Sequence, residues 1–198
     1  MTDLLLEPLP TEWEGRAIDP DFRHMVWMMN QFHRAKTDDD KVQLMHGAIR
    51  RFFREPVSIQ DTPAAFESLM CFCLGGVDEE STGGHSSEEP RPDVTMDYHC
   101  DAEYFVGAFQ QTYGIDLTTE KVHWWRFKAL LHALPEEVPL MRIINIRQAD
   151  TTDMDETRKR WYEEMKERFA LPPTLKGGKR IVTVQEHNEA FLDRFSAD

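Results

Sequence analysis

The chain has 198 residues, of which 40% are hydrophobic and 11% aromatic, so it is long enough to bury a core and too apolar for wholesale disorder. Its 23 basic and 36 acidic residues give a formal net charge of −13, which argues against broad binding to nucleic-acid phosphates or to an anionic membrane. No apolar run approaches the roughly 18 residues of a spanning helix, and residues 1–8 lack a basic segment, so we expect neither a membrane anchor nor a signal peptide. Three cysteines, an odd number, favour a reducing compartment.

The first part of the chain is predicted to form a short β element followed by three helices. Residues 13–18 are typical of a turn followed by a short strand. The helices are expected at 19–36, 37–55 and 62–74, because apolar residues recur there at helical spacing after residues that favour a helix start. The predicted inward faces are Phe22, Val26, Met29 and Phe32 with Met25 beside them, then Val42, Met45, Ile49, Phe52 and Phe53, then Phe66, Leu69, Met70 and Cys73.

Residues 75–97 differ in kind from the segments on either side. They contain four glycines and two prolines, and their seven acids against one arginine give a charge of 1 − 7 = −6. Such a segment buries too little apolar surface to offset the entropy lost on ordering. We therefore predict a flexible acidic loop that interrupts one helical domain spanning residues 1–173.

Helical spacing resumes at Tyr98 and predicts four further helices, at 98–113, from a cap at Asp116 or Thr118 to 134, at 139–147 and at 152–169. The second of them has two apolar stripes and is expected to be central to the core. Those stripes are Val122, Trp125, Ala129 and His132, and Trp124, Phe127, Leu131 and Leu134. The inward face of the last helix is predicted to be Met154, Trp161, Met165 and Phe169.

Residues 174–198 form a C-terminal extension, in which a short helix is expected to dock through Phe191, Leu192 and Phe195. The predicted fold class is all-α, or mainly α: a compact multi-helix domain of six to eight helices with a short N-terminal β element.

Two groups of residues invite a chemical interpretation. Cys71 and Cys73 are spaced C-x-C, without the second pair of ligands that a zinc site needs, so we interpret them as small buried hydrophobes. Cys100 lies between His99 and Asp101, but neighbours on one helix do not give the geometry of a Cys/His nucleophile. We predict no catalytic residue, no metal ligand and no cofactor, and hence no enzyme.

Two apolar residues are candidates for contact with a partner protein. Trp124 and Trp125 are neighbours, so either both rings lie in a core enclosed on two sides, or one belongs to a protein–protein surface, where tryptophan is enriched. Met28 is similar, because it lies off the main stripe of its helix and methionine suits adaptable binding surfaces. Trp124 and Met28 are the predicted partner-binding residues, although burial within the fold would explain both.

Several distinctive blocks occur over about residues 12–173. The central block comprises Asp97-Tyr98-x-x-Asp101-Ala102-Glu103-Tyr104, Phe109-Gln-Gln-x-Tyr113-Gly114-Ile115-Asp116-Leu117 and His123-Trp124-Trp125-x-Phe127-x-Ala129-Leu130. The flanking blocks are Asp19-Pro-Asp21-Phe22-Arg23, Ile143-Ile144-x-x-Arg147, and Arg158-Lys-Arg-Trp-Tyr162 through Phe169-Ala170-Leu171-Pro172. Together these blocks resemble the bacteriophage gene-product-fifteen family. The long acidic segment at 75–97 and the extension beyond 173 depart from the family pattern.

The resemblance implies a non-enzymatic role in a phage or prophage tail module. We expect a tail assembly chaperone that binds the tape-measure protein during viral morphogenesis and keeps it soluble. It would act in the host bacterial cytoplasm and be absent from the mature virion. The alternative is a structural virion protein of the tail or of the head–tail junction. The expected partners are phage tail proteins or further copies of this chain, and neither nucleic acid nor membrane.

Overall fold

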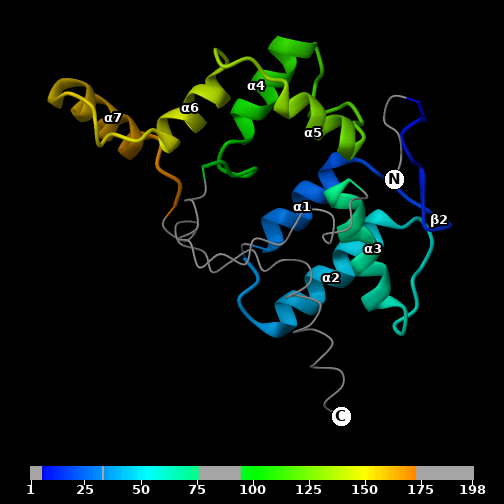
Figure 1. Cartoon of the computed structure of the whole chain (residues 1–198). Helices are drawn as coiled ribbons and strands as arrows, with labels where there is room; N and C mark the ends of the chain where they lie inside the picture. Colours follow the sequence, from blue (N-terminus) through cyan, green and yellow to red (C-terminus); the bar gives the residue numbers. More distant parts are fainter. Residues whose placement is uncertain (1–5, 33, 76–94, 173–198) are drawn as a thin grey trace. The chain divides into compact units, whose positions relative to one another are not determined.

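The computed structural model describes residues 6–32, 34–75 and 95–172. Those residues form seven helices and one two-stranded antiparallel hairpin, which confirms the prediction of a mainly α-helical fold with six to eight helices (Figure 1). Most of the predicted acidic loop, residues 76–94, and the whole C-terminal extension lie outside the described residues. No helix within the described ranges is both long and apolar enough to cross a membrane.

The described residues divide into two compact units, and each is described by itself. Unit 1 contains the residues up to 75 together with 121–128, and unit 2 contains 95–120 and 129–172. One helix, α5 (Trp124–His132), supplies its first residues to unit 1 and its last to unit 2. The predicted single domain over 1–173 stays a prediction.

Unit 1 begins with the predicted β element. Strand β1 (Glu12–Trp13) pairs antiparallel with β2 (Arg16–Ala17) through a two-residue turn. Both turn residues have positive φ, 48° at Glu14 and 74° at Gly15, which is the conformation that hairpin turns of this length require. The indole N–H of Trp13 donates to the carbonyl of Ser68 over 3.0 Å and so ties the hairpin to the helical part of the unit.

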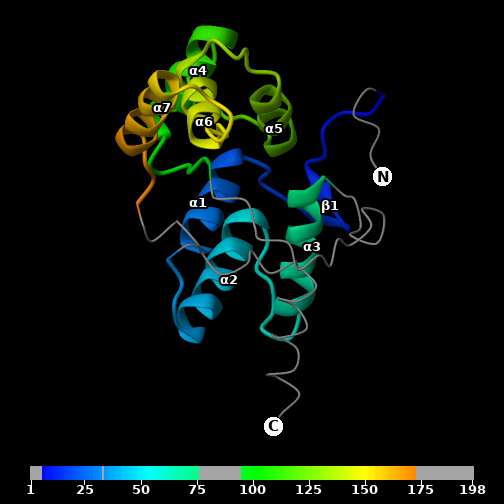
Figure 2. The same ribbon diagram turned by 60° about the vertical axis from the view of Figure 1, so that its left-hand side comes forward.

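Three helices form the body of unit 1: α1 (Phe22–Phe32), α2 (Asp38–Phe52) and α3 (Thr62–Leu74), with α2 packed against both of the others (Figures 1 and 2). Thr37 caps α2: its hydroxyl accepts from the N–H of Asp40 and the Asp40 carboxylate accepts from the N–H of Thr37. Helix α3 ends at Gly75, whose φ of 93° is the left-handed conformation expected there.

The predicted inward face of α1 is partly wrong. The helix begins at Phe22 rather than Asp19, and its buried residues are Phe22, Met25 and Met28, whereas Val26, Met29 and Phe32 are only partly buried. The stripe that faces inward is set by partners far along the chain, which helical spacing alone does not reveal. Phe22 stacks on the ring of Phe127 with centroids 4.5 Å apart.

Unit 2 contains α4 (Ala102–Tyr113), α6 (Pro139–Gln148) and α7 (Glu156–Arg168), and α6 packs against both α4 and α7 (Figure 1). Gly114 ends α4 with a φ of 69°, the left-handed conformation that glycine favours at a helix end. Helix α5 starts at Trp124 and is capped by neither Asp116 nor Thr118, because the Asp116 carboxylate accepts from the N–H and hydroxyl of Thr118 and holds that segment in a turn. On α5, Ala129 and His132 are exposed rather than inward-facing.

The inward face predicted for α7 is wrong only at Trp161, because Met154, Met165 and Phe169 are partly buried. None of its residues is buried, and the side chain of Trp161 is 49% exposed. The residues that turn partly inward include Tyr162, Met165 and Phe169. Neighbours on a helix are about 100° apart, so the faces through Trp161 and Tyr162 fit the apolar spacing almost equally well.

Candidate partner-binding groove

The structure buries both residues that were predicted to contact a partner. Trp124 is 2% exposed and donates its indole N–H to the carbonyl of Cys73 over 3.0 Å. Met28 is 1% exposed, and Trp125 is 4% exposed. Both tryptophan rings therefore belong to the core, the first of the two alternatives. A role of Trp124 or Met28 in partner binding stays an untested prediction, and the accessible residue is the neighbour of Met28, Trp27.

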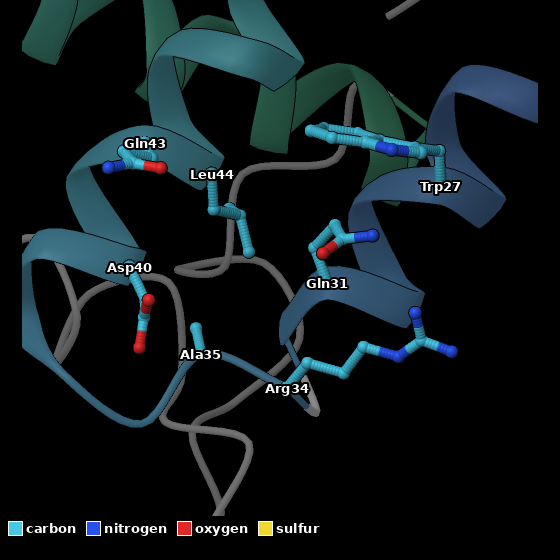
Figure 3. A pocket seen from close by; sticks show the side chains of 7 residues that line it. All are labelled: Trp27, Gln31, Arg34, Ala35, Asp40, Gln43 and Leu44. Atoms are coloured by element: carbon cyan, nitrogen blue, oxygen red, sulfur yellow. The ribbon is translucent and has the colours of Figure 1, made fainter.

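Trp27 lines an open groove between α1 and α2 with a volume of about 220 Å³ (Figure 3). The groove is lined by Trp27 and Gln31 of α1, by Arg34 and Ala35 of the connecting turn, and by Asp40, Gln43 and Leu44 of α2. In Figure 3 the ring of Trp27 extends from α1 toward α2, and the side chain of Leu44 points into the space between the helices. The groove thus has an aromatic wall, an aliphatic floor and a polar rim.

The ring of Trp27 is held in place from α2. A Cβ built on Gly47 would lie 2.5 Å from Cη2 of Trp27, so only glycine leaves room for the edge of the ring. The guanidinium carbon of Arg51 lies 3.8 Å from the ring centroid, a cation–π contact that covers one face. Figure 3 shows the ring nearly edge-on, with one face toward the groove.

The charges at the rim of the groove are not equivalent. The Asp40 carboxylate accepts from the backbone N–H groups of Thr37 and Lys36, and these bonds, that of Thr37 foremost, hold its pKa below the ordinary value. Asp40 is therefore occupied by the helix cap. Arg34 is exposed and forms no ion pair among the described residues. Asp40 stays ionised, so the rim carries one negative and one positive side chain, and Arg34 is the one whose charged group is not bound by the helix cap.

Sequence reasoning missed Trp27 because it considered mainly the residues on the apolar stripes. The signal was a tryptophan off the stripe, one turn before Gln31 and two turns before Arg34 on the same polar face. A tryptophan among polar residues at helical spacing indicates a half-exposed ring rather than a core ring.

Comparison with known proteins decides the family. The profile described as "Bacteriophage Gp15 protein" matches residues 5–171. The chain belongs to the bacteriophage Gp15 protein family. This confirms the resemblance seen in the sequence and establishes a phage-family protein. No curated protein and no solved structure matches the chain.

The His-Trp-Trp block of this Gp15-family protein joins α5 to the end of α3. Beside the bond from Trp124, the indole N–H of Trp125 donates to Phe72 O over 2.7 Å, and Lys128 Nζ donates to Cys73 O over 2.7 Å. The last carbonyls of a helix lack partners within the helix, and a cation is favourable there. The block therefore has a structural role in unit 1.

His123 is also occupied in this arrangement. Its Nδ1 accepts from the N–H of Trp125 over 3.1 Å, so Nε2 carries the proton and donates to Pro10 O over 3.1 Å. Burial lowers the pKa of His123 below its ordinary value, against a smaller opposing effect of the bond to Pro10. The neutral ring has both nitrogens engaged and leaves none for a proton transfer to a substrate.

Residues of three family blocks, Asp101, Arg147 and Phe169, meet at Arg147 in unit 2. Its guanidinium makes a two-bond ion pair with Asp101, over 2.7 and 2.8 Å, and also donates to the carbonyls of Thr95 (3.0 Å) and Phe169 (2.7 Å). Asp101 is 1% exposed and also accepts from the N–H of Asp97 over 3.0 Å. This network, here called the Arg147 hub, ties the start of α4, α6 and the end of α7 together.

The cysteines offer little nucleophilic chemistry. Cys73 is buried, which raises the pKa of its thiol to about 12. Cys100 is exposed, but desolvation and the nearby carboxylates of Asp97 and Asp101 raise the pKa of its thiol as well. A catalytic cysteine needs a lowered pKa, so Cys100 is the opposite of an activated nucleophile. Among the described residues, no three His, Cys, Asp or Glu side chains are grouped so that they could hold a metal ion.

Proposed function

We propose that this protein is a tail assembly chaperone that binds the tape-measure protein while the phage tail is built, and that it catalyses no reaction. The observation that carries the proposal is the Gp15 family match over residues 5–171, which makes it a phage protein. The role in tail assembly comes from the known setting of the family in tail modules.

Physical features of the chain support this role. A chaperone for a long amphipathic helix has to cover apolar surface and keep the complex soluble. The groove between α1 and α2 offers an aromatic wall in the form of Trp27 and an aliphatic floor in Leu44. A net charge of −13 makes complexes repel one another, which discourages clumping.

Three features favour binding over catalysis. His123 has both ring nitrogens engaged by backbone groups, and the thiol of Cys100 has a raised pKa. Arg147 and the carboxylate of Asp101 are likewise engaged in the packing of unit 2. These are the groups that a hydrolase or transferase would need to keep available.

Co-expression tests the proposal. The tape-measure protein of the same phage is produced with and without this protein, and its soluble yield and co-purification are measured. We expect a higher soluble yield and a stable complex in cells. An equally insoluble tape-measure protein, with no tail component co-purifying, would refute the chaperone role. Mass spectrometry of mature particles separates the alternative, because a chaperone leaves the particle and a structural virion protein stays.

A further inference from the structure

The groove beside Trp27 has the size of one large side chain. Its volume of about 220 Å³ lies below the roughly 300–1,000 Å³ of small-molecule and cofactor pockets. At about 30 Å³ for each water, it holds on the order of seven water molecules. A leucine, methionine or aromatic side chain would displace that water and pack against the ring of Trp27 and the side chain of Leu44. The ligand is therefore a protruding residue of a larger molecule rather than a free metabolite.

The aromatic wall is built before any ligand arrives. Gly47 leaves room for the edge of the Trp27 ring, and the guanidinium of Arg51 covers one face at 3.8 Å. A ring fixed in this way loses little conformational entropy on binding, which is the property of an anchor residue in a protein interface. Tryptophan is among the residues on which interface affinity most often depends.

The rim of the groove carries one carboxylate and one guanidinium, and only the carboxylate is bound by backbone groups of the helix cap. Asp40 is occupied by the N–H groups of Thr37 and Lys36, whereas Arg34 has no ion-pair partner among the described residues. A guanidinium in this state attracts a carboxylate, which it can bind through two parallel hydrogen bonds. The amides of Gln31 and Gln43 add donors and acceptors at the same rim.

We propose that the groove binds one large apolar side chain of an amphipathic helix in the tape-measure protein, with an Asp or Glu carboxylate within one helical turn of it paired to Arg34. This inference rests on the proposed function. It adds to that function the surface of this protein that binds and the chemistry of the partner segment. That segment is a helix with an acidic residue beside its apolar anchor residue, even though this chain is acidic overall.

The test compares matched variants in the same co-purification with the tape-measure protein. Trp27→Ala should weaken binding by roughly 30-fold, the loss expected of an interface anchor, while the half-exposed Trp161→Ala in unit 2 should leave it unchanged. Arg34→Glu should weaken binding about 5-fold and flatten its salt dependence, while Arg50→Glu, an exposed α2 residue outside the groove lining with the same charge change, should not. Because Arg34 is exposed, its substitution tests the groove without threatening the fold.

A photo-crosslinking amino acid at Gln43 identifies the occupant directly. We expect crosslinks to an apolar residue of the tape-measure protein that has an acid within four residues. If the wild-type protein binds the tape-measure protein but the Trp27 and Arg34 variants bind as well as it does, the groove proposal is wrong and the chaperone role stands. Crosslinks to a second copy of this chain or to residues 174–198 would also overturn it. If the wild-type protein does not bind at all, the proposed function itself fails.

Discussion

Replacing Arg147 should destabilise unit 2 more than replacing any exposed residue of that unit. Its guanidinium is 11% exposed and makes four hydrogen bonds, two of them to the carboxylate of Asp101, which is 1% exposed. Arg147→Met leaves that carboxylate buried without its counter-charge and leaves two carbonyls short of a donor. Removing one partner of a buried ion pair costs about 3–5 kcal/mol. A domain of ordinary stability has about 5–15 kcal/mol to lose, so the effect should be a large shift of the urea midpoint.

Three further measurements test this prediction. Arg142→Met removes an exposed arginine of the same helix and should change the free energy of unfolding by no more than about 0.5 kcal/mol. The double variant Arg147→Met, Asp101→Asn should lose less than the sum of the two single variants, because the unpaired charge is gone. Hydrogen exchange should speed up first in α4, α6 and α7. A loss below about 1 kcal/mol for Arg147→Met, or additive single variants, would refute the reasoning that the hub holds unit 2 together.

Other substitutions test unit 1. Gly47→Ala should lower the free energy of unfolding by about 1–3 kcal/mol, because the alanine Cβ would lie 2.5 Å from the ring of Trp27. Helix propensity alone predicts the opposite, a gain of up to about 1 kcal/mol. A variant that is more stable than the wild-type protein in urea denaturation would therefore contradict the structure. Trp125→Ala should cost about 3–5 kcal/mol by the same assay, since the ring is 4% exposed, and a midpoint change equivalent to less than about 1 kcal/mol would show that the ring is not in the core. Burial lowers the pKa of His123, so at mildly acidic pH the unfolded chain binds more protons than the folded protein. The stability contributed by the neutral His123 should be complete above pH about 6.5 and be lost as the pH falls through the folded-state pKa. Urea midpoints measured between pH 8 and 5 should therefore depend less on pH in His123→Gln than in the wild-type protein. Identical profiles for the two proteins would contradict that assignment.

The sequence was sufficient for what depends on neighbours along the chain. The cap at Thr37, the left-handed ends at Gly75 and Gly114 and the turn at Gly15 all follow from the local conformational preferences of those residues, and all are found. The number and order of the helices followed from apolar spacing for the same reason. The resemblance of the central block to the Gp15 family could also be recognised from the sequence.

Only the tertiary structure decided which face of each helix turns inward and what the family blocks do. Adjacent residues on a helix differ by about 100°, so a shift of one residue exchanges Trp161 for Tyr162 on α7, and apolar spacing hardly distinguishes the two. The contacts that settle such choices join residues distant in sequence, as between Asp101 and Arg147, and local preferences carry no information about them. The same holds for the groove: Trp27 became a candidate only because a glycine twenty residues later lets its ring lie between two helices while one face stays accessible.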